Sequence, residues 1–179
     1  MRRKWFAVVA LAGFAVLPAT SMAQVGYGLA AGLSTPEGDF TRIAHPGYHL
    51  TGLVTFSPPL APVGFRGEAS ISRFRDKFGS ATTQILSATA NAVFAAPSLV
   101  GLYFIGGIGI YNASAICNGC TSNSTRGGIN VGGGFKFGLG GLEAFLEARY
   151  HYIPGPMDAT TGGIKSSTRF IPVSFGLKF

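Results

Sequence analysis

The sequence is poor in charge. Only 12% of its 179 residues are Asp, Glu, Lys or Arg, about half the ~25% that is usual for soluble domains. Apolar residues make up 47% of the chain, so the side chains needed for a fully hydrated exterior are scarce. After residue 4 the basic residues are spread singly along the chain, which argues against a basic surface for nucleic acid.

Long uninterrupted apolar runs are also missing from most of the chain. Segment 98–116 comes nearest to a membrane helix, but it contains four glycines and many β-branched and aromatic residues. This composition weakens a helix and suits a strand. Since only helices and closed barrels satisfy their backbone in lipid, an apolar chain without convincing spanning helices points to a β-barrel.

The first 23 residues have the pattern of an export signal. Arg2, Arg3 and Lys4 precede an apolar run over residues 5–17, and the small-residue site Ser21-Met22-Ala23 follows. We predict a secretory signal peptide over residues 1–23, cleaved before Gln24, with an uncleaved N-terminal anchor as the alternative. Cleavage would leave 11 basic against 7 acidic residues. Residues 24–179 are expected to form one domain.

From Gln24 onward the hydropathy follows a period of two, as in strands with two different faces. The clearest example is 142–152, where Leu142, Ala144 and Leu146 alternate with Glu143 and Glu147. Each segment has about ten residues, the length that a tilted strand needs to cross a bilayer. The alternation predicts eight strands, over 24–33, 48–57, 64–74, 86–94, 99–113, 129–137, 142–152 and 169–179.

The connections between these segments alternate in length. Longer polar loops are expected at 35–47, 75–81, 114–126 and 155–168, and short turns elsewhere. Outer-membrane barrels have this asymmetry, with short periplasmic turns and longer outer loops. The predicted fold is therefore all-β, an eight-stranded antiparallel up-and-down transmembrane β-barrel.

A soluble lipocalin-like ligand-binding barrel would show the same period, so the two faces must be told apart. The polar face consists mostly of Gly, Ser, Thr and Asn. It therefore carries too few charged side chains for an exterior in contact with water. The apolar face is therefore expected outside and the polar face inside. An eight-stranded barrel is just wide enough to be filled by side chains, which predicts a closed lumen. The charged and polar lumen residues are predicted to be Arg66, Glu68, Lys136, Glu143, Glu147, Arg149 and His151.

The last strand carries the most specific pattern in the chain. Val173, Phe175, Leu177 and Phe179 alternate on its apolar face, and an aromatic residue stands last. With this strand, residues 24–179 resemble the small bacterial outer-membrane β-barrel family of the OmpA/OmpX type. The resemblance implies an assembly signal read by the barrel-assembly machinery, export by the secretion machinery, contact with outer-membrane lipid and lipopolysaccharide, and a monomer. It implies fold and location more strongly than activity.

Only two cysteines are present, in the segment Cys117-Asn118-Gly119-Cys120. Asn-Gly favours a tight turn that brings the sulfurs together, and in an exported protein this spacing favours a disulfide over metal binding or redox chemistry. We expect no cofactor, no metal site and no catalytic residues.

For function, the favoured hypothesis is a closed scaffold that displays its loops, with adhesin-like or lipopolysaccharide-contacting roles. The alternative is a lipid-A-modifying enzyme using His49, Glu147 and His151, although no serine lies beside His151. Basic residues are expected to gather near the loops and to meet lipopolysaccharide phosphates. They are Arg42, Arg73, Arg75, Lys77, Arg126, Lys165 and Arg169. The sequence names no extracellular ligand.

Overall fold

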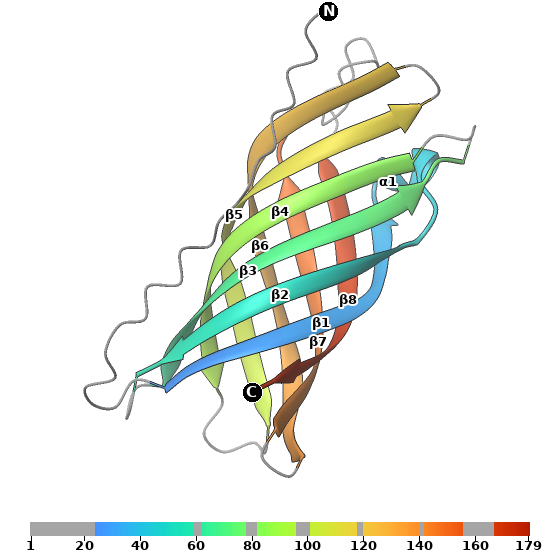
Figure 1. Ribbon diagram of the computed structural model, residues 1–179. Helices are drawn as coiled ribbons and strands as arrows, with labels where there is room; N and C mark the ends of the chain where they lie inside the picture. The colour runs from blue at the N-terminus through green and yellow to red at the C-terminus, as the bar shows by residue number, and fades with distance from the viewer. Residues whose placement is uncertain are drawn as a thin grey trace, which may run out of the picture.

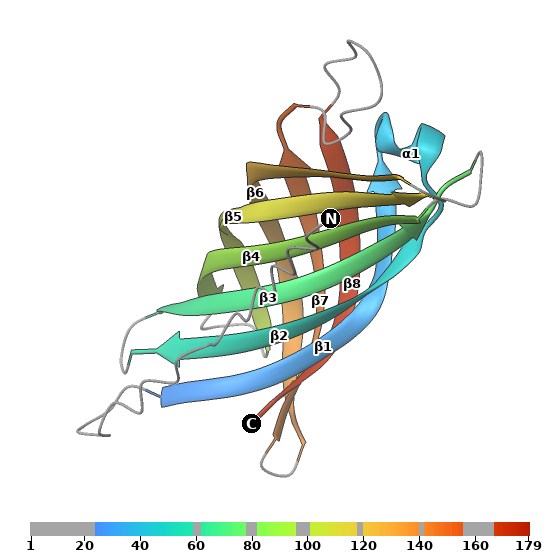
Figure 2. The same cartoon turned by 45° about the horizontal axis from the view of Figure 1, so that its top comes forward.

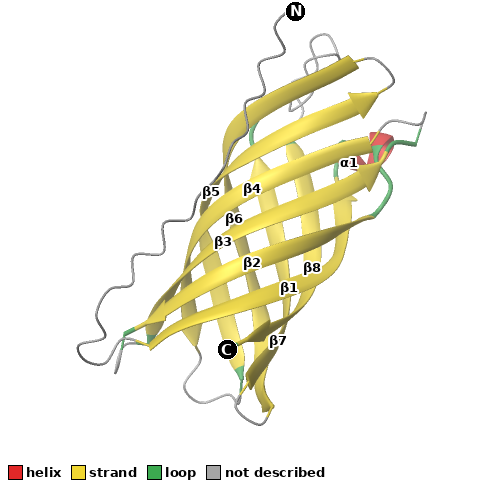
Figure 3. Ribbon diagram, viewed as in Figure 1, coloured by secondary structure: helices red, strands yellow, loops and turns green. Residues whose placement is uncertain are grey.

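The computed structural model describes residues 24–58, 62–77, 82–95, 101–117, 120–139, 142–155 and 167–179. They form a closed barrel in which each strand is hydrogen-bonded to the next and β1 to β8, all antiparallel. Within these ranges a short helix, α1, interrupts the run of strands (Figure 3). The elements are β1 (Gln24–Glu37), α1 (Phe40–Ile43), β2 (Gly47–Ser57), β3 (Val63–Arg75), β4 (Thr82–Ala95), β5 (Leu102–Cys117), β6 (Cys120–Leu139), β7 (Leu142–Ile153) and β8 (Thr168–Lys178). The predicted fold class is confirmed.

The barrel closes where the first strand meets the last. The amide of Tyr27 donates to the carbonyl oxygen of Phe179 at 2.9 Å, and the amide of Phe179 donates back at 2.8 Å. The start of β1 and the finish of β8 therefore lie at one end of the barrel, which we call the terminal end (Figure 1). The opposite end, where α1 lies, is the loop end (Figure 2).

The outer surface is apolar, as the alternation predicts. Leu33 and Ile108 are each 68% exposed and Phe104 is 63% exposed, while their sequence neighbours face inward. On β5 the inward residues include Tyr103 and Ile105, both nearly fully buried. This is the reverse of a soluble barrel, which keeps its apolar face inside.

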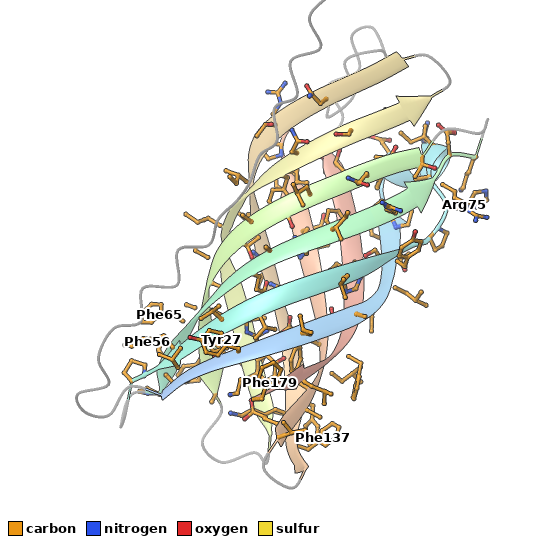
Figure 4. All side chains as sticks on the ribbon, in the orientation of Figure 1. Tyr27, Phe56, Phe65, Arg75, Phe137 and Phe179 are labelled. Carbon is orange, nitrogen blue, oxygen red and sulfur yellow. The ribbon has the colours of Figure 1, made fainter. Side chains whose placement is uncertain are left out.

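Aromatic rings mark the terminal end of the outer surface. Those labelled in Figure 4 near this end are Tyr27, Phe56, Phe65, Phe137 and Phe179, whereas Arg75 lies at the loop end. Such rings at the border of an apolar band are typical of a barrel that meets a membrane interface.

Two predicted loops are wrong in part. The segment 114–126 belongs largely to β5 and β6, which pair as far as Cys117 and Cys120. Its polar residues favour a loop by composition, but they pair across the strands instead, as where Ser114 of β5 is the register partner of Asn123 of β6. In the segment 35–47, β1 continues to Glu37 and α1 follows.

Inside the barrel, apolar side chains form two separate clusters. The first fills the loop end and includes Phe40 of α1, which packs edge-on against Phe74 with ring centroids 5.1 Å apart. Its members are Phe40, Ala44, Phe74, Ile85, Tyr111, Ala113, Ile153 and Phe170. The second contains Ala30, Leu53, Tyr103, Ile105 and Phe145. Polar side chains occupy the lumen besides these clusters. No helix among the described residues is long and apolar enough to span a membrane.

Candidate functional site

Four charged side chains form a ring of ion pairs in the lumen. Arg66 Nη1 lies 2.7 Å from Glu147 Oε2 and 3.3 Å from Glu68 Oε1. Arg149 approaches the same two carboxylates, Glu68 Oε2 at 2.6 Å and Glu147 Oε1 at 2.8 Å. Each arginine thus contacts both glutamates. Because two charges of each sign are present, the ring is formally neutral.

The ring joins opposite walls of the barrel. Arg66 and Glu68 stand on β3, and Glu147 and Arg149 stand on β7, four strands away in a barrel of eight. The spacing of two within each pair sends both side chains to the same face of a strand. All four side chains are at least nine-tenths buried. The ion pairs therefore cross the interior along its width and obstruct it.

Neutral polar groups add further hydrogen bonds to this ring. The hydroxyl of Tyr103 donates to Glu147 Oε2 at 2.6 Å, and Thr89 donates to Glu68 Oε2 at 3.2 Å. Asn91 donates to the same Glu68 oxygen at 3.3 Å, and Asn130 donates to Asn91 Oδ1 at 2.9 Å. Buried charges are tolerated when they are paired and hydrogen-bonded. All four charges of the ring are paired, and among its buried nitrogens and oxygens only Arg66 Nε has no hydrogen-bond partner in the described part of the chain.

A second group links three strands across the closure. His49 of β2 shares hydrogen bonds with Ser34 of β1 (Oγ to Nδ1, 2.9 Å) and Ser174 of β8 (Oγ to Nε2, 2.8 Å). All three residues are buried. His151 is separate from this group and from the ring. It bonds to Tyr111 through Nδ1 at 2.9 Å and stacks on Phe170.

Contact between His49 and two serines raises the question of nucleophilic catalysis. A catalytic histidine is normally oriented by a carboxylate on its second nitrogen, and here a serine occupies that position. The adjoining cavity has a volume of about 10 Å³, room for about one water. An acyl chain has no space there, so the group fits a structural role and does not supply the site expected for lipid-A modification.

A third charged group lies at the terminal end. Glu143 of β7 contacts Lys178 of β8 at 2.8 Å through Oε1 and Lys136 of β6 at 3.3 Å through Oε2. All three side chains are partly exposed. The sequence places Lys136 and Glu143 at similar depth because they flank one tight turn. Lys178 is not among the predicted lumen residues, although its position on the inward face of the last strand is visible in the alternation.

The other predicted site residues have different outcomes. Cys117 and Cys120 are register partners at the tip of the β5–β6 hairpin, but their side chains lie outside the described residues, so the disulfide stays a prediction. Val173, Phe175, Leu177 and Phe179 all point outward and are exposed. The predicted signal peptide over 1–23 and Lys165 also lie outside the described residues. Four buried polar residues were not predicted as site residues, and the sequence marks them only by their place on the inward face of a strand. They are Ser34, Tyr103, Asn130 and Ser174.

Comparison with known proteins agrees with the architecture. The family model described as outer membrane protein beta-barrel domain matches residues 6–179. No curated protein matches the sequence. Among solved structures, Neisserial surface protein A is 16% identical, with 88% of this chain and 98% of that chain covered and a TM-score of 0.59.

Two further structures share the fold at low identity. The N-terminal β-barrel domain of Pseudomonas aeruginosa OprF is 16% identical, with 88% of this chain and 100% of that chain covered and a TM-score of 0.50. A major outer membrane protein from Thermus thermophilus is 12% identical, with 87% and 99% covered and a TM-score of 0.54. With the family model spanning nearly the whole chain, this protein belongs to the outer membrane protein beta-barrel domain family.

Proposed function

We propose that the protein is a closed outer-membrane scaffold that presents its loop end to the outside. The observation that carries this proposal is the ion-pair ring between β3 and β7, which joins opposite walls of the lumen. The apolar cluster around Phe74 fills the loop end above it. A barrel obstructed at two levels is suited to holding an outer surface in place and unsuited to passing solutes. The role is non-enzymatic, which the small cavity beside His49 supports.

In this proposal the first 23 residues direct export and are removed, and the terminal end faces the periplasm. The longest connection supports this orientation, since β7 and β8 are separated by 14 residues at the loop end, whereas the connections at the terminal end have two to six residues. The outward row of Val173, Phe175, Leu177 and Phe179 is available to the barrel-assembly machinery as the last strand is delivered. The predicted state is a monomer in outer-membrane lipid.

We expect the mature protein to show no steady single-channel conductance in planar lipid bilayers. The reason is that the ring leaves no continuous water path along the lumen, which side chains fill in a barrel of this size. The Phe40→Ala variant, which thins only the loop-end cluster, should also be silent because the ring is intact. A stable open level from the wild-type protein would contradict the closed scaffold.

The loop end carries an excess of positive charge. Its described basic residues are Arg42, Arg73, Arg75, Lys77, Arg126 and Arg169, against Glu37, Asp39 and Asp76. Arg73, Arg75 and Arg126 are exposed, and guanidinium groups bind phosphate oxygens in pairs. We therefore propose that this surface contacts the phosphates of lipopolysaccharide, which would surround the loop end in an outer membrane.

Replacing Arg73, Arg75 and Arg126 together by Gln should weaken lipopolysaccharide binding. We expect at least a fivefold loss of affinity and a shallower dependence on salt, because fewer phosphate contacts are made. The measurement is binding of purified lipopolysaccharide to the barrel in zwitterionic lipid nanodiscs. The matched control replaces Lys136 and Lys178 at the terminal end by Gln, which should leave this binding unchanged. Equal losses in both variants would show that net charge, and not the loop end, is responsible.

A further inference from the structure

The terminal end contains a cavity that the closed-scaffold role does not use. Its volume is about 220 Å³. It lies between the β2 to β5 wall, which contributes Thr55, Arg66 and Tyr103, and the β6 to β8 wall, which contributes Lys136, Glu143 and Lys178. The ring of ion pairs forms its inner limit through Arg66. The cavity is therefore a blind recess and not part of a channel.

The charged side chains at the mouth of this recess carry a net positive charge. Arg66 is already paired with Glu68 and Glu147 of the ring, whereas Lys136 and Lys178 share one carboxylate, that of Glu143. Glu143 uses one oxygen for each lysine, whereas an ammonium group has three donors. Each lysine thus keeps donors beyond its contact with Glu143. The lysines also stand at the entrance, where they are 39% and 27% exposed.

Arg66 lies at the inner wall of the recess. Its side chain is 7% exposed, and its buried Nε has no hydrogen-bond partner among the described residues. A buried donor without a partner is costly, and most such groups in native proteins are satisfied by a water, an ion or a ligand. Because this Nε is itself buried, it does not reach the recess, and the free donors there are those of Lys136 and Lys178.

Apolar side chains form part of the remaining wall and limit the size of an occupant. They are Leu53, Val93 and Phe145, which line the recess beside the polar Thr55, Ser57 and Tyr103. A cavity of about 150 Å³ with apolar walls is known to hold benzene, so 220 Å³ accommodates a substituted ring or a short chain. An occupant of this recess combines a small apolar body with an anionic group.

We propose that the terminal-end recess is a binding site for small organic anions, carboxylates with a compact apolar body, that enter from the periplasmic side. Lys136 and Lys178 attract and hold the carboxylate at the entrance, and the apolar body packs against Leu53, Val93 and Phe145. The site is separate from the loop end and does not depend on lipopolysaccharide binding there.

The test uses three probes of the same shape and different charge: 4-fluorobenzoate, 4-fluorobenzamide and 4-fluorobenzamidinium. Binding is followed by fluorine NMR with the mature barrel in zwitterionic lipid nanodiscs, which leave both ends of the barrel open to water. We expect saturable binding of the benzoate with a Kd of about 1 mM or tighter, and at least tenfold weaker binding of the amide and the amidinium. No saturable binding of the benzoate, or equal binding of the amide, would overturn the proposal.

Variants separate a charge effect from a packing effect. Replacing Lys136 and Lys178 by Gln should weaken benzoate binding at least tenfold, while replacing both by Arg should retain it because the charge is kept. Lys77→Gln at the loop end is the matched control and should bind as the wild type does. Heat-modifiable gel migration reports that each variant is folded. Retained binding in the folded double Gln variant would refute the site.

Discussion

Glu147→Gln should destabilise the folded barrel by about 3–5 kcal/mol, the usual cost of removing one partner from a buried ion pair. The substitution preserves size but leaves two arginines facing one remaining carboxylate, Glu68, in the lumen. It also turns the acceptor of the Tyr103 hydroxyl into a neutral group. The ring then carries a net positive charge where water is largely excluded.

The measurement is denaturant unfolding of the barrel in lipid vesicles, followed by gel migration and circular dichroism. Tryptophan fluorescence is unsuitable because the single tryptophan, Trp5, lies in the predicted signal peptide. Asp39→Asn is the matched control. It removes an ion pair with Arg42 at 3.7 Å whose side chains are 58% and 82% exposed, and exposed pairs contribute little. A midpoint for Glu147→Gln equal to that of Asp39→Asn would show that the ring is solvated and dispensable.

The ring also shows which part of this site is accessible from sequence. The alternation along each strand places Arg66, Glu68, Glu147 and Arg149 inside, because successive side chains point to opposite faces of a strand. The alternation does not say which residues lie at the same height along the barrel axis. Lys136 and Glu143 can be paired in advance since they flank one turn, but pairing β3 with β7 requires the tilt of the strands around a closed barrel, which only the structure provides.

The errors have a similar physical origin. Polar residues suggest the end of a strand, yet β5 and β6 continue as a paired hairpin through residues such as Ser114 and Asn123. A strand that leaves the apolar band needs polar side chains while its backbone pairing continues. Helix α1 has only four residues, too few for a helical period to be visible. Its role, placing Phe40 into the loop-end cluster, depends on distant contacts.

Gly32→Ala should prevent or strongly weaken closure between β1 and β8. A Cβ at this position would lie 1.8 Å from the carbonyl oxygen of Val173, an atom of the neighbouring backbone that cannot rotate away. We expect a loss of about 3 kcal/mol, at the upper end of the usual cost of overpacking, and a smaller folded fraction by heat-modifiable migration. The matched control is Gly67→Ala, since nothing lies within 4 Å of its added Cβ. Alanine there should be neutral or slightly stabilising.

An added Cβ at Gly32 would be close to both a backbone atom and a side chain, and a second substitution can tell which of them is the obstacle. The same Cβ would lie 2.9 Å from Cε1 of His49, the ring that joins Ser34 to Ser174 across the closure. If this side chain were the obstacle, adding His49→Ala to Gly32→Ala would restore folding, since a truncated side chain makes room. We expect no rescue, because the nearer atom belongs to the β8 backbone. Recovery in the double variant would instead place the constraint on the histidine and leave the strand spacing free to adjust.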